Sequence, residues 1–289
     1  MLKIVEKKKI WFTISILIIV IGFGFMFTKG MNFGIDFRGG TQVVINMGTD
    51  FNKTDVDKIV DEYSKDAVTN QVNGTEIQIK AKELNSSQVN DIFKALKEKY
   101  DLKDDALVSQ NEIGASVGRD LTTNAIVALV IAVIGMLIYV VIRFEFSFGI
   151  AAIIALLHDV LITISVYAVF GITINTPFIA AILTIVGYSI NDTIVIFDRI
   201  RENRKKLRGK SVEEIADMSI TQTMSRSINT TLTTLITIVC VYIFVPTVRD
   251  FAFPLIVGIA SGACSSIFIA SPIWCILANR QKNKKARNK

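Results

Sequence analysis

The sequence contains few of the residues that build metal centres, disulfide frameworks and hydrolytic triads. It has one histidine among 289 residues, and its three cysteines, Cys240, Cys264 and Cys275, all lie in apolar runs without C-x-x-C spacing. Cysteines in such runs are typical of small buried apolar side chains. A single histidine argues against a Ser-His-Asp triad and against a metal site built from several histidines. We therefore expect no metal site, no bound cofactor and no enzymatic activity.

Charged residues are also scarce, at 20% of the chain, whereas hydrophobic residues make up 51% and the mean hydropathy is +0.47. Soluble globular proteins seldom reach this average, so the composition predicts a polytopic α-helical membrane protein. Six apolar runs are long enough to span a bilayer: 10–27, 121–142, 148–170, 177–197, 228–245 and 253–278. The first run is longer than the apolar region of a usual signal peptide and no A-x-A-like site follows it, so we expect an uncleaved span.

Basic residues mark one side of the predicted bundle. They precede the first run, follow the fourth and follow the sixth, whereas the loop after the third run carries no charge. Cytoplasmic loops are enriched in Lys and Arg, so both termini are expected in the cytoplasm and residues 28–119 outside it. The chain is accordingly divided into 1–27 (cytoplasmic N-terminus and first span), 28–119 (an extracytoplasmic domain), 120–278 (the rest of the bundle, with a cytoplasmic linker at 199–226) and 279–289 (a basic cytoplasmic tail).

Residues 28–119 have the pattern of a small α+β domain inserted between the first two spans. Strands are predicted at 41–46, 67–72, 75–79 and 106–109, and helices at 54–64 and 86–100. Asn73-Gly74 is a strong hairpin signal between the middle two strands. The order β-α-β-β-α-β predicts a ferredoxin-like fold. The domain has no glycine-rich phosphate loop, so we interpret it as a module that binds a partner or transmits force.

Several local signals predict where the membrane helices begin and bend. Thr176-Pro177 has the form of an N-cap followed by the first helical residue, and Phe253-Pro254 begins the last span similarly. Pro272 is expected to kink that span. Ser211 to Glu214 fits a capping box that opens a short amphipathic helix through Met224. We expect this helix to lie at the membrane surface, where its basic neighbours contact anionic lipids.

Three ionisable side chains fall inside predicted spans. Asp159 lies about eleven residues into the third span, Asp192 lies near the cytoplasmic end of the fourth, and Arg226 lies at the mouth of the fifth. A carboxylate inside the membrane is costly, so it is a candidate functional group. Arg226 is long enough to meet Asp192, and this pairing would offset part of the desolvation penalty.

Other polar residues share the same helical faces. Tyr188 and Asn191 lie on one stripe with Asp192, and Thr230 lies on one with Arg226. Such stripes are also typical of helix packing, and Asp192 itself could be a structural polar group. For Asp159 the functional and structural interpretations are evenly matched, and for His158 the structural one is favoured. On the last span, small residues from Gly258 to Gly262, followed by Ser265, favour close helix packing.

Four motifs, taken together, resemble the SecF family of the bacterial protein-export machinery. They are Gly34-Ile35-Asp36-Phe37-Arg38-Gly39-Gly40-Thr41, His158-Asp159, Gly187-Tyr188-Ser189-Ile190-Asn191-Asp192-Thr193 with Phe197-Asp198-Arg199-Ile200, and Arg226-Ser227-Ile228-Asn229-Thr230-Thr231. The resemblance covers nearly the whole chain. It implies a subunit of the bacterial cell membrane that pairs with SecD in an assembly of the resistance-nodulation-division type.

The same resemblance implies what the assembly does. Members of the family couple the flow of protons, or of sodium in some cases, to the pulling of unfolded polypeptides that leave the SecYEG channel after SecA has pushed them in. Asp192 then corresponds to the membrane carboxylate of the relay and Arg226 to its basic partner.

Two other functions fit parts of the pattern. Half of a proton-coupled lipid or drug efflux transporter would share the six-span bundle. An intramembrane aspartyl protease would use Asp159 and Asp192 as an acid–base pair, although the two acids differ in depth and the chain has no G-x-G-D motif.

Overall fold

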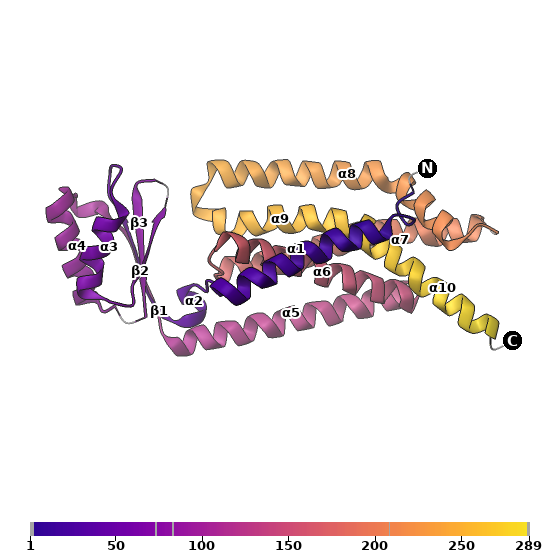
Figure 1. The fold of residues 1–289 in the computed structure, drawn as a ribbon, viewed down its shortest axis with the longest axis horizontal. Helices are drawn as coiled ribbons and strands as arrows, with labels where there is room; N and C mark the ends of the chain where they lie inside the picture. Colours follow the sequence, from indigo (N-terminus) through magenta and orange to yellow (C-terminus); the bar gives the residue numbers. More distant parts are fainter. Residues whose placement is uncertain (1–2, 73, 83, 208, 288–289) are drawn as a thin grey trace. The chain divides into compact units, whose positions relative to one another are not determined.

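The computed structural model describes residues 3–72, 74–82, 84–207 and 209–287, and the chain divides into a helical unit and an outer unit (Figure 1). The helical unit consists of the described parts of Met1–Asn32 and Val127–Lys289, and the outer unit of those of Phe33–Ile126. Each has its own cluster of buried apolar side chains.

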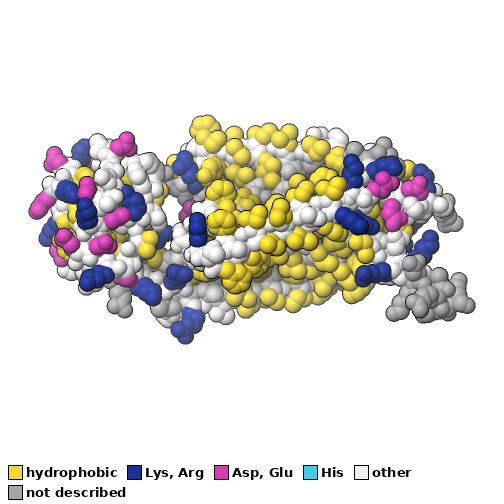
Figure 2. All heavy atoms as spheres, in the orientation of Figure 1, with side chains coloured by type: hydrophobic (Ala, Val, Ile, Leu, Met, Phe, Trp, Pro, Cys, Tyr) yellow, Lys and Arg dark blue, Asp and Glu magenta, His cyan; other side chains and the backbone are white. Residues whose placement is uncertain are grey.

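Six candidate membrane spans are present in the described part of the chain, which confirms the predicted number. The first five are α1 (Lys8–Lys29), α5 (Ala115–Arg143), α6 (Phe146–Phe170), α7 (Thr176–Lys206) and α8 (Val212–Phe244). The sixth is built from η2 (Pro246–Val248), α9 (Arg249–Ser265), the π-helical turn η3 (Ser266–Ala270) and α10 (Ser271–Arg287). Figure 2 shows hydrophobic side chains over the middle of the helical unit, with charged side chains gathered towards its ends.

Two helix starts differ from the sequence prediction. The N-cap of α7 is Asn175, whose side-chain oxygen accepts a hydrogen bond from the backbone N–H of Phe178, so Thr176 is the first helical residue. An asparagine accepts this bond as well as a threonine does, and the sequence offered both. α9 begins at Arg249, and Pro254 therefore lies inside the helix rather than at its start.

The expected short surface helix through Met224 is instead the first part of α8. The capping box at Ser211 and Glu214 is present, but the helix runs unbroken to Phe244 because no glycine or proline interrupts it. Its early residues Ile215, Ala216 and Ile220 are buried in the bundle, so this segment is not a surface helix. Residues 199–206 of the expected linker likewise form the last turns of α7.

The predicted break near Pro272 is present. The π-turn η3 separates α9 from α10, and α10 leaves the direction of α9 (Figure 1). Proline lacks the N–H that would continue the α-helical pattern. The Ser271 hydroxyl donates to the carbonyl oxygen of Ser266, five residues earlier, at 3.0 Å and so satisfies one backbone acceptor in the turn.

Glycines let α9 approach α7 closely, as the small residues of the last span predicted. A Cβ at Gly258 would lie 2.2 Å from Ile185, and one at Gly262 would lie 2.9 Å from the Cβ of Ser189. Near the other end of the bundle, the Trp274 ring stacks on Phe148 with ring centroids 4.9 Å apart. These contacts hold α9 against α7 and α10 against α6.

The outer unit has the predicted β-α-β-β-α-β order. Its elements are α2 (Ile35–Arg38), β1 (Gly40–Asn46), α3 (Lys53–Tyr63), β2 (Val68–Val72), β3 (Glu76–Ala81), α4 (Ser86–Tyr100), η1 (Asp104–Ala106) and β4 (Leu107–Ile113). The strands form one antiparallel sheet in the order β2-β3-β1-β4, the ferredoxin-like arrangement. The predicted hairpin joins β2 and β3; of its two turn residues, Asn73 lies outside the described residues.

The start of β1 depends on two consecutive glycines. Gly39 and Gly40 have φ of 74° and 126°, which side-chain-bearing residues rarely adopt. A Cβ at Gly40 would also lie 2.5 Å from the backbone oxygen of Ala81 on β3. This pair therefore allows the chain to turn out of α2 directly into the sheet.

Candidate functional site

Asp159 of α6 is fully buried and holds three helices together. Its Oδ2 accepts hydrogen bonds from Ser189 of α7 at 2.7 Å and from Ser265 of α9 at 2.8 Å. Its Oδ1 accepts one from Ser261 of α9 at 2.8 Å and lies 3.1 Å from Nδ1 of His158. Each carboxylate oxygen thus has two partners, which offsets the desolvation of a buried acid.

The π-turn places further hydroxyl groups beside this cluster. Ser265 contacts Asp159, and its neighbour Ser266 lies 2.7 Å from the hydroxyl of Thr193 on α7. Helical turns of this kind are frequent at functional sites because they redirect successive side chains. The contacts explain why α9 follows α7 closely along this stretch.

Asp192 of α7 is buried but far less satisfied. Its Oδ1 accepts one hydrogen bond, from the hydroxyl of Ser227 on α8 at 2.7 Å. Its Oδ2 has no hydrogen-bond partner among the described residues. A buried, unpaired carboxylate oxygen is unfavourable, so this acid is a candidate for gaining and losing a proton or another cation.

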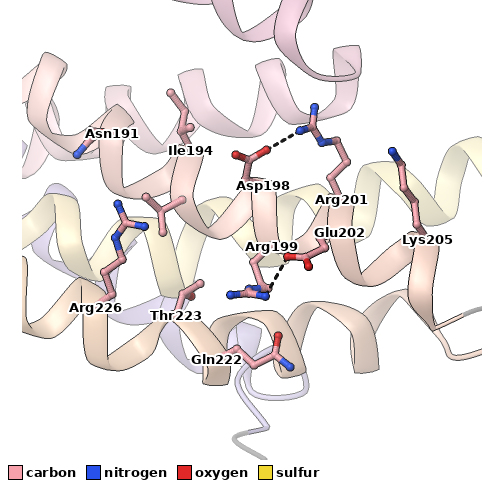
Figure 3. Close-up of a pocket in the computed structure, with 11 residues that line it drawn as sticks. Asn191, Ile194, Asp198, Arg199, Arg201, Glu202, Lys205, Gln222, Thr223 and Arg226 are labelled. Atoms are coloured by element: carbon pink, nitrogen blue, oxygen red, sulfur yellow. Dashed lines mark hydrogen bonds and ion pairs between the residues drawn. The ribbon is translucent and has the colours of Figure 1, made fainter.

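The predicted ion pair between Asp192 and Arg226 is not formed. Within the described part of the chain, no Lys or Arg nitrogen lies within 4.0 Å of Asp192. Ser227 takes the place beside the acid, and successive residues of a helix point about 100° apart, so Arg226 faces a different direction. Arg226 instead lines a cavity between α7 and α8 (Figure 3).

This cavity has a volume of about 640 Å³ and is lined by many charged groups. Asn191 and Arg226 lie at one end of it, and Lys205, in the last turns of α7, lies at the other (Figure 3). Arg201 and Arg199 make ion pairs with Asp198 and Glu202 at 2.8 and 2.9 Å (Figure 3). Arg226 has no such pair among the described residues. A polar cavity of this size has room for water, and it reaches Asn191, the residue next to Asp192.

The supporting polar residues occupy the α7–α8 contact. The Tyr188 hydroxyl donates to the carbonyl oxygen of Thr230 at 3.0 Å and lies 3.1 Å from the hydroxyl of Thr234. Thr230, Thr233 and Thr237 donate to backbone oxygens of their own helix, and their side chains are exposed. Thr230 therefore lies at the edge of the α7–α8 contact, and all three threonines remain exposed in the described part of the chain.

The structure thus brings some predicted site residues together and separates others. Tyr188 meets Thr230, and His158 meets Asp159. Among the described residues, Asp159 and Asp192 have no common hydrogen-bonding partner, so the structure gives no support to an aspartyl-protease pair. Among the described residues, no group of three or more His, Cys, Asp or Glu side chains could hold a metal ion.

Four serines at the two acids were not predicted as site residues: Ser189, Ser227, Ser261 and Ser265. Ser265, and Ser261 within the run of small residues, were noted only as packing residues. One signal was available, because Ser261 and Ser265 are four residues apart and so share a helix face. Their common partner on another helix could not be found from that spacing.

Comparisons with known proteins agree over almost the whole chain. Residues 92–280 match the family described as protein export membrane protein SecD/SecF, C-terminal, and residues 24–51 match the SecD/SecF GG motif. The chain is similar to the protein translocase subunit SecF of Petrotoga mobilis, with 37% identity over 96% of each chain. It is 39% identical to that of Sebaldella termitidis, over 98% of this chain and 94% of the relative.

A solved structure shares the fold. The crystal structure of SecDF from Thermus thermophilus, a translocon-associated membrane protein, matches with a TM-score of 0.88 and 34% identity. The match covers 96% of this chain but 39% of the SecDF chain. The present chain therefore corresponds to about two fifths of that longer protein.

Proposed function

The chain belongs to the SecD/SecF family of protein export membrane proteins, and from this premise we propose that it uses a cation gradient to drive late steps of polypeptide export through the Sec channel. Its relatives are protein translocase subunits, which is a transport role rather than a catalytic one. One observation carries the proposal. Asp192 has an unpaired carboxylate oxygen in the membrane, close to a charged cavity that opens between α7 and α8.

In this proposal Asp192 alternates between two protonation states. The charged form needs Ser227, water from the cavity or the guanidinium of Arg226, whereas the protonated form is compatible with its apolar neighbours. In this proposal Arg226, which makes no ion pair within the described residues, turns towards the acid when the acid is charged. Each proton that crosses a potential of 100 mV yields about 2.3 kcal/mol, which changes a two-state ratio by more than tenfold.

Asp159 takes a supporting part in the proposed relay. Its carboxylate is bound by residues of three helices, so a change in its protonation would loosen α6, α7 and α9 together. Either a proton or a sodium ion could be the coupling ion, since the oxygen donors at both acids suit both ions.

The exposed polar face of α8 supports a partner within the membrane. Thr230, Thr233 and Thr237 would face lipid if the chain worked alone, whereas threonines in membrane helices are enriched at contacts with other helices. We propose SecD as the partner that covers this face, because the related SecDF chain contains a large segment in addition to the part matched here. The SecYEG channel, SecA and the unfolded polypeptides that they export complete the assembly.

The orientation is part of the same proposal. Both termini lie in the cytoplasm of a bacterial cell, residues 28–119 lie outside the plasma membrane, and the basic segments contact anionic lipids at the inner surface. The cavity at the last turns of α7 then opens to the cytoplasm.

The test is polypeptide export into membrane vesicles with and without an ion gradient. Asp192→Asn should abolish the gradient-driven part of export, because an amide cannot carry a negative charge, while copurification with SecD is unchanged. Glu145→Gln is the control, since Glu145 is an exposed acid at the same end of the bundle whose ion pair is with Arg204. Separate collapse of the proton and sodium gradients identifies the ion. Gradient-driven export that persists in Asp192→Asn would contradict the proposal.

A further inference from the structure

A second cavity lies in the helical unit, between α1, α6 and α9, and is separate from the charged one between α7 and α8. Its volume is about 350 Å³. Most of its lining is apolar, with Ile14, Ile18 and Phe268 among the walls. Small-molecule sites typically measure roughly 300–1,000 Å³, so this cavity has the size of a small ligand site.

Two buried polar atoms in the lining of this cavity have no hydrogen-bond partner in the described part of the chain. They are Nε1 of Trp11 on α1 and Nε2 of His158 on α6. Buried polar groups in proteins are nearly always paired, and an unpaired one in an apolar wall indicates an occupant that supplies the bond. The two atoms come from different helices and line the same cavity, so one ligand could bond to both of them.

The chemistry of these atoms limits what the occupant can be. The indole N–H of Trp11 only donates, so the occupant must offer an acceptor. Nδ1 of His158 lies 3.1 Å from the carboxylate oxygen of Asp159, and when it donates there the neutral ring leaves Nε2 as an acceptor. The occupant must therefore also offer a donor, and a hydroxyl group does both.

The rest of the cavity favours a neutral molecule. Its lining contains no Lys, Arg, Asp or Glu side chain that could pair with a charge. Ile14 and Ile18 of α1 line the cavity and are themselves exposed apolar residues, so this wall of the cavity lies at the apolar surface of the helical unit. We propose that this cavity binds a neutral, mostly apolar molecule with a hydroxyl group, which bonds to Trp11 and His158.

A ligand in this cavity would affect the Asp159 cluster through the contact between His158 and Asp159. His158 contacts the ligand through Nε2 and Asp159 through Nδ1, and Asp159 joins α6 to α7 and α9. A bound molecule therefore fixes the tautomer of His158, and with it the hydrogen bond from Nδ1 to the carboxylate of Asp159. An effect of occupancy on export rests on the proposed function, because Asp159 belongs to the proposed relay, whereas binding itself is measured by labelling without any ion gradient.

The experiment uses the full-length protein in lipid vesicles and two photoreactive probes. One is a long-chain alcohol that carries a diazirine, and the other is the same chain with hydrogen in place of the hydroxyl group. Mass spectrometry then locates the label. The alcohol should label the cavity residues of α1 and α9 in excess of the hydrocarbon by at least roughly 2–10-fold, the contribution of one of its two proposed hydrogen bonds.

Two matched variants test the origin of this excess. Trp11→Phe removes the N–H but keeps an aromatic ring against Phe268, whose centroid lies 4.0 Å from that of Trp11. It should lower the excess, because only the hydrogen bond to His158 remains. Trp274→Phe is the control, because Nε1 of Trp274 is equally unpaired but does not line this cavity. This variant should keep the excess.

Three results would overturn the proposal. Equal labelling of the wild-type protein by both probes would show a groove that holds ordinary acyl chains, and this comparison needs no variant. An excess that is undiminished in Trp11→Phe would show that the indole N–H does not bind the hydroxyl group. If Trp274→Phe lowered the excess as much as Trp11→Phe does, the cavity would not be the source of the excess.

Discussion

Replacement of Gly40 by alanine tests whether the sheet of the outer unit depends on this residue. Gly40 has φ of 126° and its added Cβ would lie 2.5 Å from the backbone oxygen of Ala81. Strained backbone conformations cost about 1–3 kcal/mol, and forcing atoms into a filled space costs about 1–3 kcal/mol more. The overlap involves backbone on both strands, since Thr41 pairs with Ala81, so a side-chain rotation cannot relieve it.

The expected destabilisation is therefore about 2–6 kcal/mol, and amides of β1 should exchange with solvent faster by a factor of at least about 30. Hydrogen exchange of the full-length protein, read at Val43 and Ile45, measures this effect. Gly48→Ala is the matched control, because Gly48 also has a positive φ, of 72°, but its added Cβ would have no neighbour within 4 Å. That change should cost about 1–2 kcal/mol. Equal exchange in the two variants would refute the steric argument.

Three further predictions concern stability and packing. The Ser64 hydroxyl and the backbone N–H of Lys82 lower the pKa of Asp66 below its unfolded value of about 3.9. The charged carboxylate therefore stabilises the fold fully above that value, and this contribution is lost as the pH falls through the folded pKa. Between pH 5 and pH 2.5 the melting temperature should fall less in Asp66→Asn than in the wild type. The same fall in both proteins would contradict this role of Asp66. Gly262→Val should lower the melting temperature by pushing α9 from Ser189, whereas Gly187→Ala should not, since nothing lies within 4 Å of its added Cβ. Asp217→Ala should speed hydrogen exchange at Ile4 and Val5, whose N–H groups both donate to Asp217 Oδ1, whereas Asp217→Asn keeps that oxygen and should change it much less.

The number of spans and the order of elements in the outer unit could be predicted because both depend on local patterns. A long apolar run and a two- or 3.6-residue period are properties of one segment and need no knowledge of its neighbours. β4 shows the limit of this reasoning. It was predicted as 106–109 because apolar alternation stops there, but it continues to Ile113 through backbone pairing with β1.

The contacts between membrane helices could not be predicted in the same way. Which of Arg226 and Ser227 meets Asp192 depends on the rotation of α8 about its axis, and that rotation is set by the packing of the whole bundle. Depth along each helix, which the sequence does give, placed Arg226 within reach of Asp192 and so led to the prediction of an ion pair that the structure does not contain among its described residues. The partners of Asp159 likewise come from two other helices.

The unbroken course of α8 has a mechanical consequence. Its 33 residues measure about 50 Å at 1.5 Å each, so the helix is longer than the hydrocarbon layer of about 30 Å. It contains neither glycine nor proline and therefore behaves as a stiff rod without an internal hinge. A tilt of about 5° at one end would move the other by about 4 Å for a rod of that length. A change of charge near Ser227 that tilts α8 slightly would therefore displace its other end, on the far side of the bilayer.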